Sequence, residues 1–366
     1  GTVTLIITLP SLIFRATHSR NSDVTLLALK KGQNIFTDSL FFDFFIGLFS
    51  FTICFLIFYS ELGNYFGIQT VTSVILLYLF STIVQTFSET SKAILIFHGK
   101  MKSFSYLEFL TVLTRFLAIL FLFSVHPSIE NYLIAQTIYS STYGLLGVYL
   151  ASKYAKFQII NFESLISYFK RIKKSYGKLR FDQIVGLIPQ HLDVILLGVI
   201  SDISSVGIYK FAKKLIEPIN YIVVTFNPWL QNKLKDSSSS FEINVFFKKI
   251  LLPLSCLISI MYVGFGKKII SILGSDEFSD SYIPMLILLI GFIIYLYTFW
   301  IRQYLLFNNL ITFHAYGRLI YSGVFLLLAI PLAQIYSSRG IAISLSSAMV
   351  LQKSYEYLIY KKKLKS

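Results

Sequence analysis

The chain has 366 residues, of which 55% are hydrophobic and only 14% are charged. A soluble protein has about 45–50% apolar and about 25% charged residues, so this composition excludes a soluble domain. Lysine and arginine outnumber aspartate and glutamate by 33 to 18, which gives a formal net charge of +15. Such an excess is typical of proteins that bind nucleic acid or a membrane surface, and the positions of the basic residues distinguish the two classes.

Apolar runs long enough to cross a bilayer, about 20 residues each, follow one another along the whole chain. A partial first segment covers residues 1–14. Ten full spans are predicted after it, at 39–59, 71–97, 105–124, 132–152, 182–200, 206–230, 247–265, 281–306, 316–336 and 340–360. The sequence therefore predicts an all-α, polytopic membrane protein.

The basic residues lie in alternate loops between these spans. One set of loops, together with the C-terminal tail, carries 23 lysines and arginines, whereas the other set carries only Lys267, Lys268 and Arg339. Because basic loops stay on the cytoplasmic side, this asymmetry predicts a cytoplasmic C-terminus. The aromatic residues are spread through the spans and do not accompany a basic patch, so nucleic acid is not an expected partner.

The longest cytoplasmic connection, residues 153–181, has apolar residues at helical spacing beside basic ones, for example Phe169 beside Lys170 and Arg171. This pattern predicts an amphipathic helix that lies on anionic lipid. A packed cytoplasmic linker with a solvated charged face is the alternative. In either case the connection separates an N-terminal transmembrane lobe, 1–152, from a C-terminal lobe with a basic tail, 182–366.

The two lobes show a weak internal repeat. The residues around Pro10 resemble those around Pro228, and each segment precedes a polar loop and four spans. If the halves are equivalent, the first helix and most of the second are missing from this chain. The full protein then has two six-helix lobes, an arrangement that internal repeats commonly give in transporters.

Charged residues within the spans are the strongest functional signal, since a charge at the bilayer centre costs about 2.5–3.5 kcal/mol. Lys210, Lys213, Lys214 and Glu217 fall on one face of the helix 206–230. We predict that this lysine stripe lines a cavity. The alternative is that the lysines extend towards the membrane interface around an internal Lys213–Glu217 pair. Asp193, in the preceding span, is expected level with Lys213 or Lys214.

A second hairpin has a similar pattern. Glu89 and Lys92 share one face of the span 71–97, and the turn near residue 101 places Glu89 roughly level with Arg115 of the next span. A salt bridge that only holds two helices together explains each of these predicted contacts equally well.

Other chemistry has little support. The five histidines are scattered, no phosphate-binding glycine loop occurs, and Cys54 and Cys256 lie far apart, so neither a metal site nor a cofactor is predicted. The outer loop with Asp276, Glu277 and Asp280 could hold a divalent metal for a membrane glycosyltransferase. A solvated acidic loop is the favoured interpretation of these three residues.

The stretch 192–215, LDVILLGVISDISSVGIYKFAKKL, contains a recognisable pattern. It resembles a signature of the O-antigen type polysaccharide flippases, which belong to the multidrug/oligosaccharidyl-lipid/polysaccharide exporter (MOP) superfamily. The matching positions are Asp193, Leu196, Leu197, Gly198, Gly207, Tyr209, Ala212, Lys214 and Leu215. The resemblance implies twelve or more helices in two lobes around a central cavity, and alternating access.

The resemblance also implies the substrate: an undecaprenyl-diphosphate-linked oligosaccharide, flipped across a bacterial inner membrane, with anionic lipid and polysaccharide assembly proteins as further partners. Intramembrane cations would offset the desolvation of the diphosphate. The candidates for substrate binding are Lys210, Lys213, Lys214, Arg115, Lys92 and Arg302. The candidates for ion pairing or coupling are Asp193, Glu217 and Glu89. A cation-coupled multidrug antiporter is the main alternative, and a membrane glycosyltransferase is the third.

Overall fold

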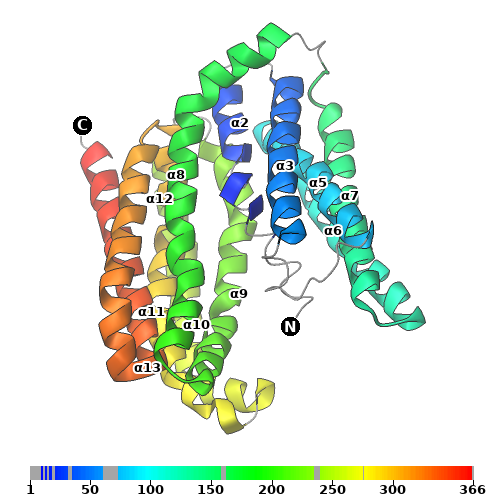
Figure 1. Cartoon of the computed structure of the whole chain (residues 1–366). Coiled ribbons are helices and arrows are strands. Elements are labelled where there is room, and N and C mark those ends of the chain that lie inside the picture. Colours follow the sequence, from blue (N-terminus) through cyan, green and yellow to red (C-terminus); the bar gives the residue numbers. More distant parts are fainter. Residues whose placement is uncertain are drawn as a thin grey trace. The chain divides into compact units, whose positions relative to one another are not determined.

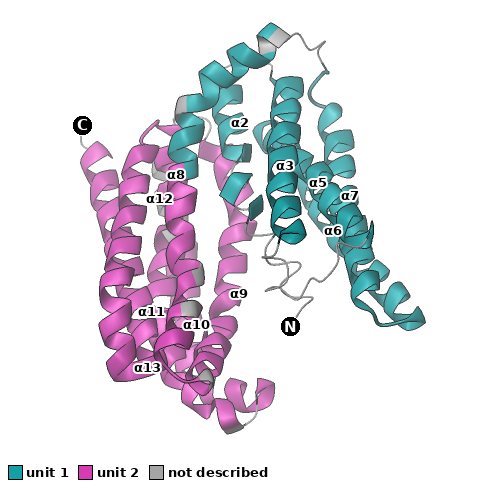
Figure 2. Ribbon diagram, in the orientation of Figure 1, with its two compact units in different colours: residues 1–180 teal, residues 181–366 magenta. Residues whose placement is uncertain are grey.

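The structure is a computed structural model, which describes residues 10, 13–14, 16–18, 21–31, 35–60, 73–157, 162–234, 240–274 and 276–364. Within these ranges every regular element is a helix (Figure 1), which confirms the predicted all-α class. Most of the predicted partial segment 1–14 lies outside the described residues. The chain forms two compact units, residues 1–180 and 181–366 (Figure 2).

Unit 1 is organised around one central helix. Its helices are α2 (Asn21–Lys30), α3 (Phe36–Tyr59), α5 (Ser73–Phe97), α6 (Met101–Val125) and α7 (Ile129–Ser152). Helix α5 packs against α2, α3, α6 and α7. Its contact with α7 is very close, since a Cβ atom at Gly144 would lie 1.9 Å from the carbonyl oxygen of Val84. Small residues allow such approaches, which provide the packing that holds helices together in lipid.

Helix α8 (Phe162–Ile200) begins in unit 1 and continues into unit 2. Its first part includes most of the predicted linker. The Tyr168 hydroxyl lies 2.8 Å from Ser39 Oγ, and the Tyr176 hydroxyl donates to the Thr17 carbonyl at 3.1 Å. Phe169 and Arg171 remain exposed. One face of this stretch is therefore packed, as in the alternative interpretation of the linker, while basic and apolar residues share the exposed face.

Unit 2 contains the second part of α8, together with α9 (Ile203–Leu234), α10 (Ser240–Leu273), the short 3₁₀ helix η2 (Asp276–Ser281), α11 (Tyr282–Thr298), α12 (Trp300–Phe307) and α13 (Ile311–Leu364). Helix α13 is interrupted at Ser337, where φ is +48°. We call residues 311–336 its first arm and residues 338–364 its second arm. The turn is tight, because a Cβ atom at Gly340 would lie 1.9 Å from the carbonyl oxygen of Leu332.

Seven of the described helices are long and apolar enough to cross a membrane. They are Phe36–Tyr59, Ser73–Phe97, Met101–Val125, Ser175–Ile200, Lys249–Leu273, Glu277–Thr298 and Ile311–Lys363. The last of these includes the turn at Ser337 and so corresponds to two predicted spans. The predicted spans 132–152 and 206–230 also coincide with helices, α7 and α9. Large apolar side chains such as Phe121 and Leu327 are exposed, as expected for a surface in lipid. The protein is a multi-pass membrane protein.

Candidate functional site

The sequence motif in unit 2 joins α8 to α9 through a buried carboxylate. Asp193 is fully buried and accepts hydrogen bonds from the Tyr209 hydroxyl at 2.7 Å and from the Val194 amide at 2.8 Å. The Lys213 ammonium forms an ion pair with the same carboxylate and also donates to the Gln190 carbonyl at 3.2 Å. Asp193 thus lies level with Lys213, one of the two positions expected from the hairpin geometry. These contacts stabilise the α8–α9 hairpin.

The lysine stripe is divided between two environments. Lys213 faces α8, whereas Lys210 is exposed and Lys214 is 74% exposed. Glu217 lies 2.6 Å from Lys214, so the Lys213–Glu217 pair of the alternative interpretation does not form. Helix packing directs the Lys213 side chain towards the buried Asp193. Glu217 therefore pairs with Lys214, which lies three residues earlier on the same helix. The accessible cations of this stripe are Lys210 and Lys214.

In unit 1 the predicted charges form different pairs from those expected. Lys92 lies between two carboxylates, 3.4 Å from Glu89 and 3.7 Å from Glu108, and 4.7 Å above the Tyr143 ring. The Tyr143 hydroxyl also contacts Glu108. This group joins α5, α6 and α7. Because the hairpin register does not fix how each helix is rotated, Glu89 meets Lys92 on its own helix and not Arg115.

Arg115 contacts a neutral polar patch on α7. Its Nη2 donates to the Tyr132 hydroxyl at 3.2 Å, and its guanidinium faces the Gln136 side chain. The guanidinium also lies 5.4 Å from the centre of the Tyr139 ring. None of these three partners is a carboxylate, so Arg115 keeps the character of an anion-binding residue.

Unit 1 also holds a polar network that the sequence interpretation missed. Asp43 of α3 is buried and accepts from Thr90 Oγ1 at 2.6 Å and from Asn21 Nδ2 at 3.0 Å. His18, also buried, lies 2.9 Å from the Thr86 carbonyl and 4.0 Å from Asp43. Asp43 was overlooked because it sits alone in a phenylalanine-rich run. An isolated acid in such a run is itself the signal of a buried, hydrogen-bonded group.

A further group of buried charges lies in unit 2, and the sequence interpretation missed it as well. His314 and Arg318 come from the first arm of α13, Lys353 and Glu356 from the second arm, and Asp182 from α8. We call these five residues the His314 cluster. The sequence signal lies in the helical spacing of the pairs 314/318 and 353/356, but only the fold brings the two pairs together. Arg302, a predicted substrate residue, lies on α12.

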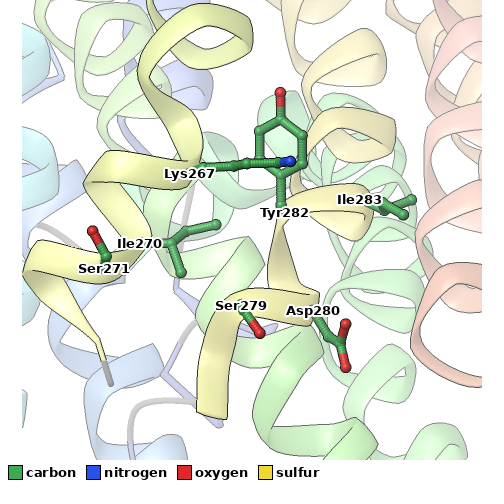
Figure 3. Close-up of a pocket in the computed structure, with 7 residues that line it drawn as sticks. All are labelled: Lys267, Ile270, Ser271, Ser279, Asp280, Tyr282 and Ile283. Carbon is green, nitrogen blue, oxygen red and sulfur yellow. The ribbon is translucent and has the colours of Figure 1, made fainter. Parts of the chain in front are cut away.

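The outer acidic loop borders a hollow at the junction of α10, η2 and α11. The hollow has a volume of about 470 Å³, and Asp280 lines it together with Lys267, Ser271, Ser279 and Tyr282 (Figure 3). The Lys267 ammonium lies 5.4 Å from the centre of the Tyr282 ring. Within the described part of the chain, no group of three or more histidine, cysteine, aspartate or glutamate side chains could hold a metal ion. The side chain of Asp276 lies outside that part.

Comparisons with known proteins identify the family. The sequence profile of the polysaccharide biosynthesis protein family matches residues 4–229, which is more than half of the chain. A comparison of this chain with curated protein sequences found no match.

Solved structures share the fold. A mutant of the Vibrio cholerae MATE transporter VcmN matches with a TM-score of 0.73 at 15% identity, over 99% of this chain and 86% of that one. The lipid II flippase MurJ matches with a TM-score of 0.68 at 14% identity, over 98% of this chain and 80% of that one. A MOP superfamily transporter from Pyrococcus furiosus matches with a TM-score of 0.73 at 11% identity, over 99% and 85%. The profile match therefore shows that the chain belongs to the polysaccharide biosynthesis protein family, and these solved structures show that it has their fold.

Proposed function

We propose that this protein flips undecaprenyl-diphosphate-linked oligosaccharide across the bacterial inner membrane by alternating access. The observation that carries the proposal is the pair of exposed lysines, Lys210 and Lys214, one helical turn apart on a helix of a transporter. An ammonium group exposed on a membrane helix needs water or an anion around it. A diphosphate supplies that anion and several acceptors for charge-assisted hydrogen bonds.

When no substrate is bound, the carboxylate of Glu217 would supply the anion that the lysines require. Its carboxylate lies 2.6 Å from Lys214, and both side chains are substantially exposed. An exposed pair of this kind contributes little to stability, so its separation costs little. The diphosphate would displace Glu217 from Lys214 on binding, and Glu217 would return on release.

The other predicted cations rank behind this pair. Lys213 is paired with Asp193, and Lys92 with Glu89 and Glu108, so we assign both to helix pairing. Arg115 faces hydroxyl and amide groups, which leaves it as the substrate candidate of unit 1. Arg302 remains a candidate on α12.

The test is transport by the full-length protein in liposomes. We expect the wild type to move a synthetic undecaprenyl-diphosphate-linked oligosaccharide. The double variant Lys210→Gln/Lys214→Gln should slow this movement by at least about tenfold, because a hydrogen bond to a charged group contributes about 1.5–3 kcal/mol. The matched control Lys102→Gln/Lys249→Gln removes the same charge from two other exposed lysines and should transport at the wild-type rate.

A second function is favoured by the fold likeness to MATE transporters and by the buried acid Asp43. A cation-coupled multidrug antiporter requires acids within the membrane. Wild-type transport of an amphiphilic organic cation such as ethidium, without transport of the lipid-linked oligosaccharide, would establish that function and reject the flippase.

A further inference from the structure

The His314 cluster is buried inside unit 2 and does not include the exposed lysines. Asp182 and Glu356 are fully buried, and His314 is 1% exposed. The second part of α8 and the two arms of α13 meet here. Two glycines make room for them: a Cβ atom at Gly317 would lie 3.0 Å from Glu356 Oε1, and one at Gly186 would lie 3.1 Å from the Arg318 guanidinium.

The imidazole of His314 lies between two carboxylates. Its Nε2 is 3.3 Å from Asp182 Oδ1, and its Nδ1 is 2.8 Å from Glu356 Oε1. A neutral imidazole has one N–H group and one lone pair, so it can face only one ionised carboxylate favourably. The other contact would bring two lone pairs together. One additional proton, on the imidazole or on one of the acids, would turn that contact into a hydrogen bond.

The surrounding charges make this additional proton easy to release. Glu356 is already paired with Lys353 at 2.7 Å, and Asp182 has Arg318 at 3.8 Å. Lys353 and Arg318 thus lie beside the two carboxylates of the cluster, and an extra proton adds further positive charge to a buried site.

The groups that face this site come from every element packed around it. Among the described residues they are Asp182 on α8, Tyr295 on α11, Arg302 on α12, Arg318 and Tyr321 on the first arm of α13, and Lys353 and Glu356 on the second arm. Tyr295 and Tyr321 present their rings to Lys353 and Arg318. The two aromatic rings hold these cations beside the carboxylates without adding charge.

We infer that Asp182, His314 and Glu356 form a proton-exchange site that binds and releases one proton in each transport cycle. The inference rests on the proposed transport function. While the proton is bound it connects α8 to both arms of α13. When these helices separate, His314 loses one carboxylate contact, the site no longer requires the proton, and the proton leaves. Proton movement is thereby tied to a rearrangement within unit 2.

The transport test uses full-length protein in liposomes that enclose a pH-sensitive dye, with a gradient of the lipid-linked oligosaccharide as the driving force. We expect substrate movement by the wild type to drive a proton flux. The His314→Gln variant should move substrate down its gradient without proton flux, because an amide neither binds nor releases a proton at neutral pH. His126→Gln, a matched change at an exposed histidine, should keep both movements. Substrate movement by the wild type without proton flux would overturn the inference.

A spectroscopic test does not depend on transport. In ¹⁵N-histidine NMR spectra of the purified protein, the signal that disappears in His314→Gln should be that of an imidazolium. If the proton rests on an acid instead, infrared spectra should show a carboxylic acid band that disappears in Glu356→Gln or Asp182→Asn. A neutral imidazole without such a band would overturn the inference even if a variant fails to fold. If the wild type does not transport the oligosaccharide at all, the proposed function fails, while these spectra still decide the proton site.

Discussion

Asp193 is the buried acid of the sequence motif that joins α8 to α9. It is buried at the α8–α9 hairpin and receives hydrogen bonds from an amide and a hydroxyl, with Lys213 as its ion-pair partner. Breaking a buried pair by removing one partner is strongly destabilising, because the remaining charge keeps its desolvation penalty. An exposed pair such as Lys214–Glu217 contributes far less.

This contrast gives a prediction for neighbouring lysines. Lys213→Gln should destabilise the protein by about 3–5 kcal/mol, whereas Lys214→Gln should change stability by less than about 1 kcal/mol. The double variant Asp193→Asn/Lys213→Gln should recover most of the loss, since neither charge remains buried. Membrane abundance and the thermal unfolding midpoint in detergent measure these effects. Equal losses from the two single lysine variants would show that Lys213 does not stabilise Asp193.

At the scale of elements, α13 behaves as two helices. Its turn at Ser337 needs a positive φ, and the arms then approach so closely that Gly340 touches the backbone of the first arm. Both arms supply charges to the His314 cluster. A second close approach, that of Gly317 to Glu356, lies at the cluster itself.

Substitutions at two glycines of α13 test how closely its two arms approach each other. Gly340→Ala would place its Cβ atom 1.9 Å from a backbone oxygen, so the arms must separate, and we expect a loss of stability of at least about 2 kcal/mol. Gly323→Ala meets nothing within 4 Å and should be neutral, or stabilising by up to about 1 kcal/mol through helix propensity. Thermal unfolding midpoints compare the two variants. Similar midpoints would contradict the tight turn.

At the scale of the whole molecule, the distribution of basic residues predicts the orientation in the membrane. Residues of the 153–181 connection and the C-terminal tail are expected on the cytoplasmic side. The exposed side chain of Arg171 and that of Ser279 on η2 are positions for labelling that this prediction assigns to opposite sides of the membrane.

Cysteine labelling measures the orientation directly. In a background without Cys54 and Cys256, an impermeant thiol reagent should modify Ser279→Cys in intact cells with a permeable outer membrane. Arg171→Cys should react only after the inner membrane is opened, because the bilayer excludes the reagent. The reverse pattern of modification would invert the orientation.

Much of the architecture follows from the sequence, because a bilayer requires long apolar runs whatever their neighbours are. Most of the predicted spans coincide with helices in the described part of the chain, although the span 281–306 is divided between α11 and α12. The length of the hairpin placed Asp193 level with Lys213 or Lys214, and the structure pairs it with Lys213. Local periodicity also indicated that Lys210 and Lys214 lie near each other on α9. These features depend on neighbours in sequence or on a short turn, so the sequence contains them.

Only the tertiary structure decided how each helix is rotated and which distant residues meet. The rotation of α9 pairs Lys213 with Asp193 and Lys214 with Glu217. In unit 1, Glu89 pairs with Lys92, which also contacts Glu108, and not with Arg115. The His314 cluster joins residues 182, 314 and 356, which no local pattern connects. Side-chain packing between helices sets these contacts, since polar groups buried in an apolar environment must find partners wherever the fold supplies them.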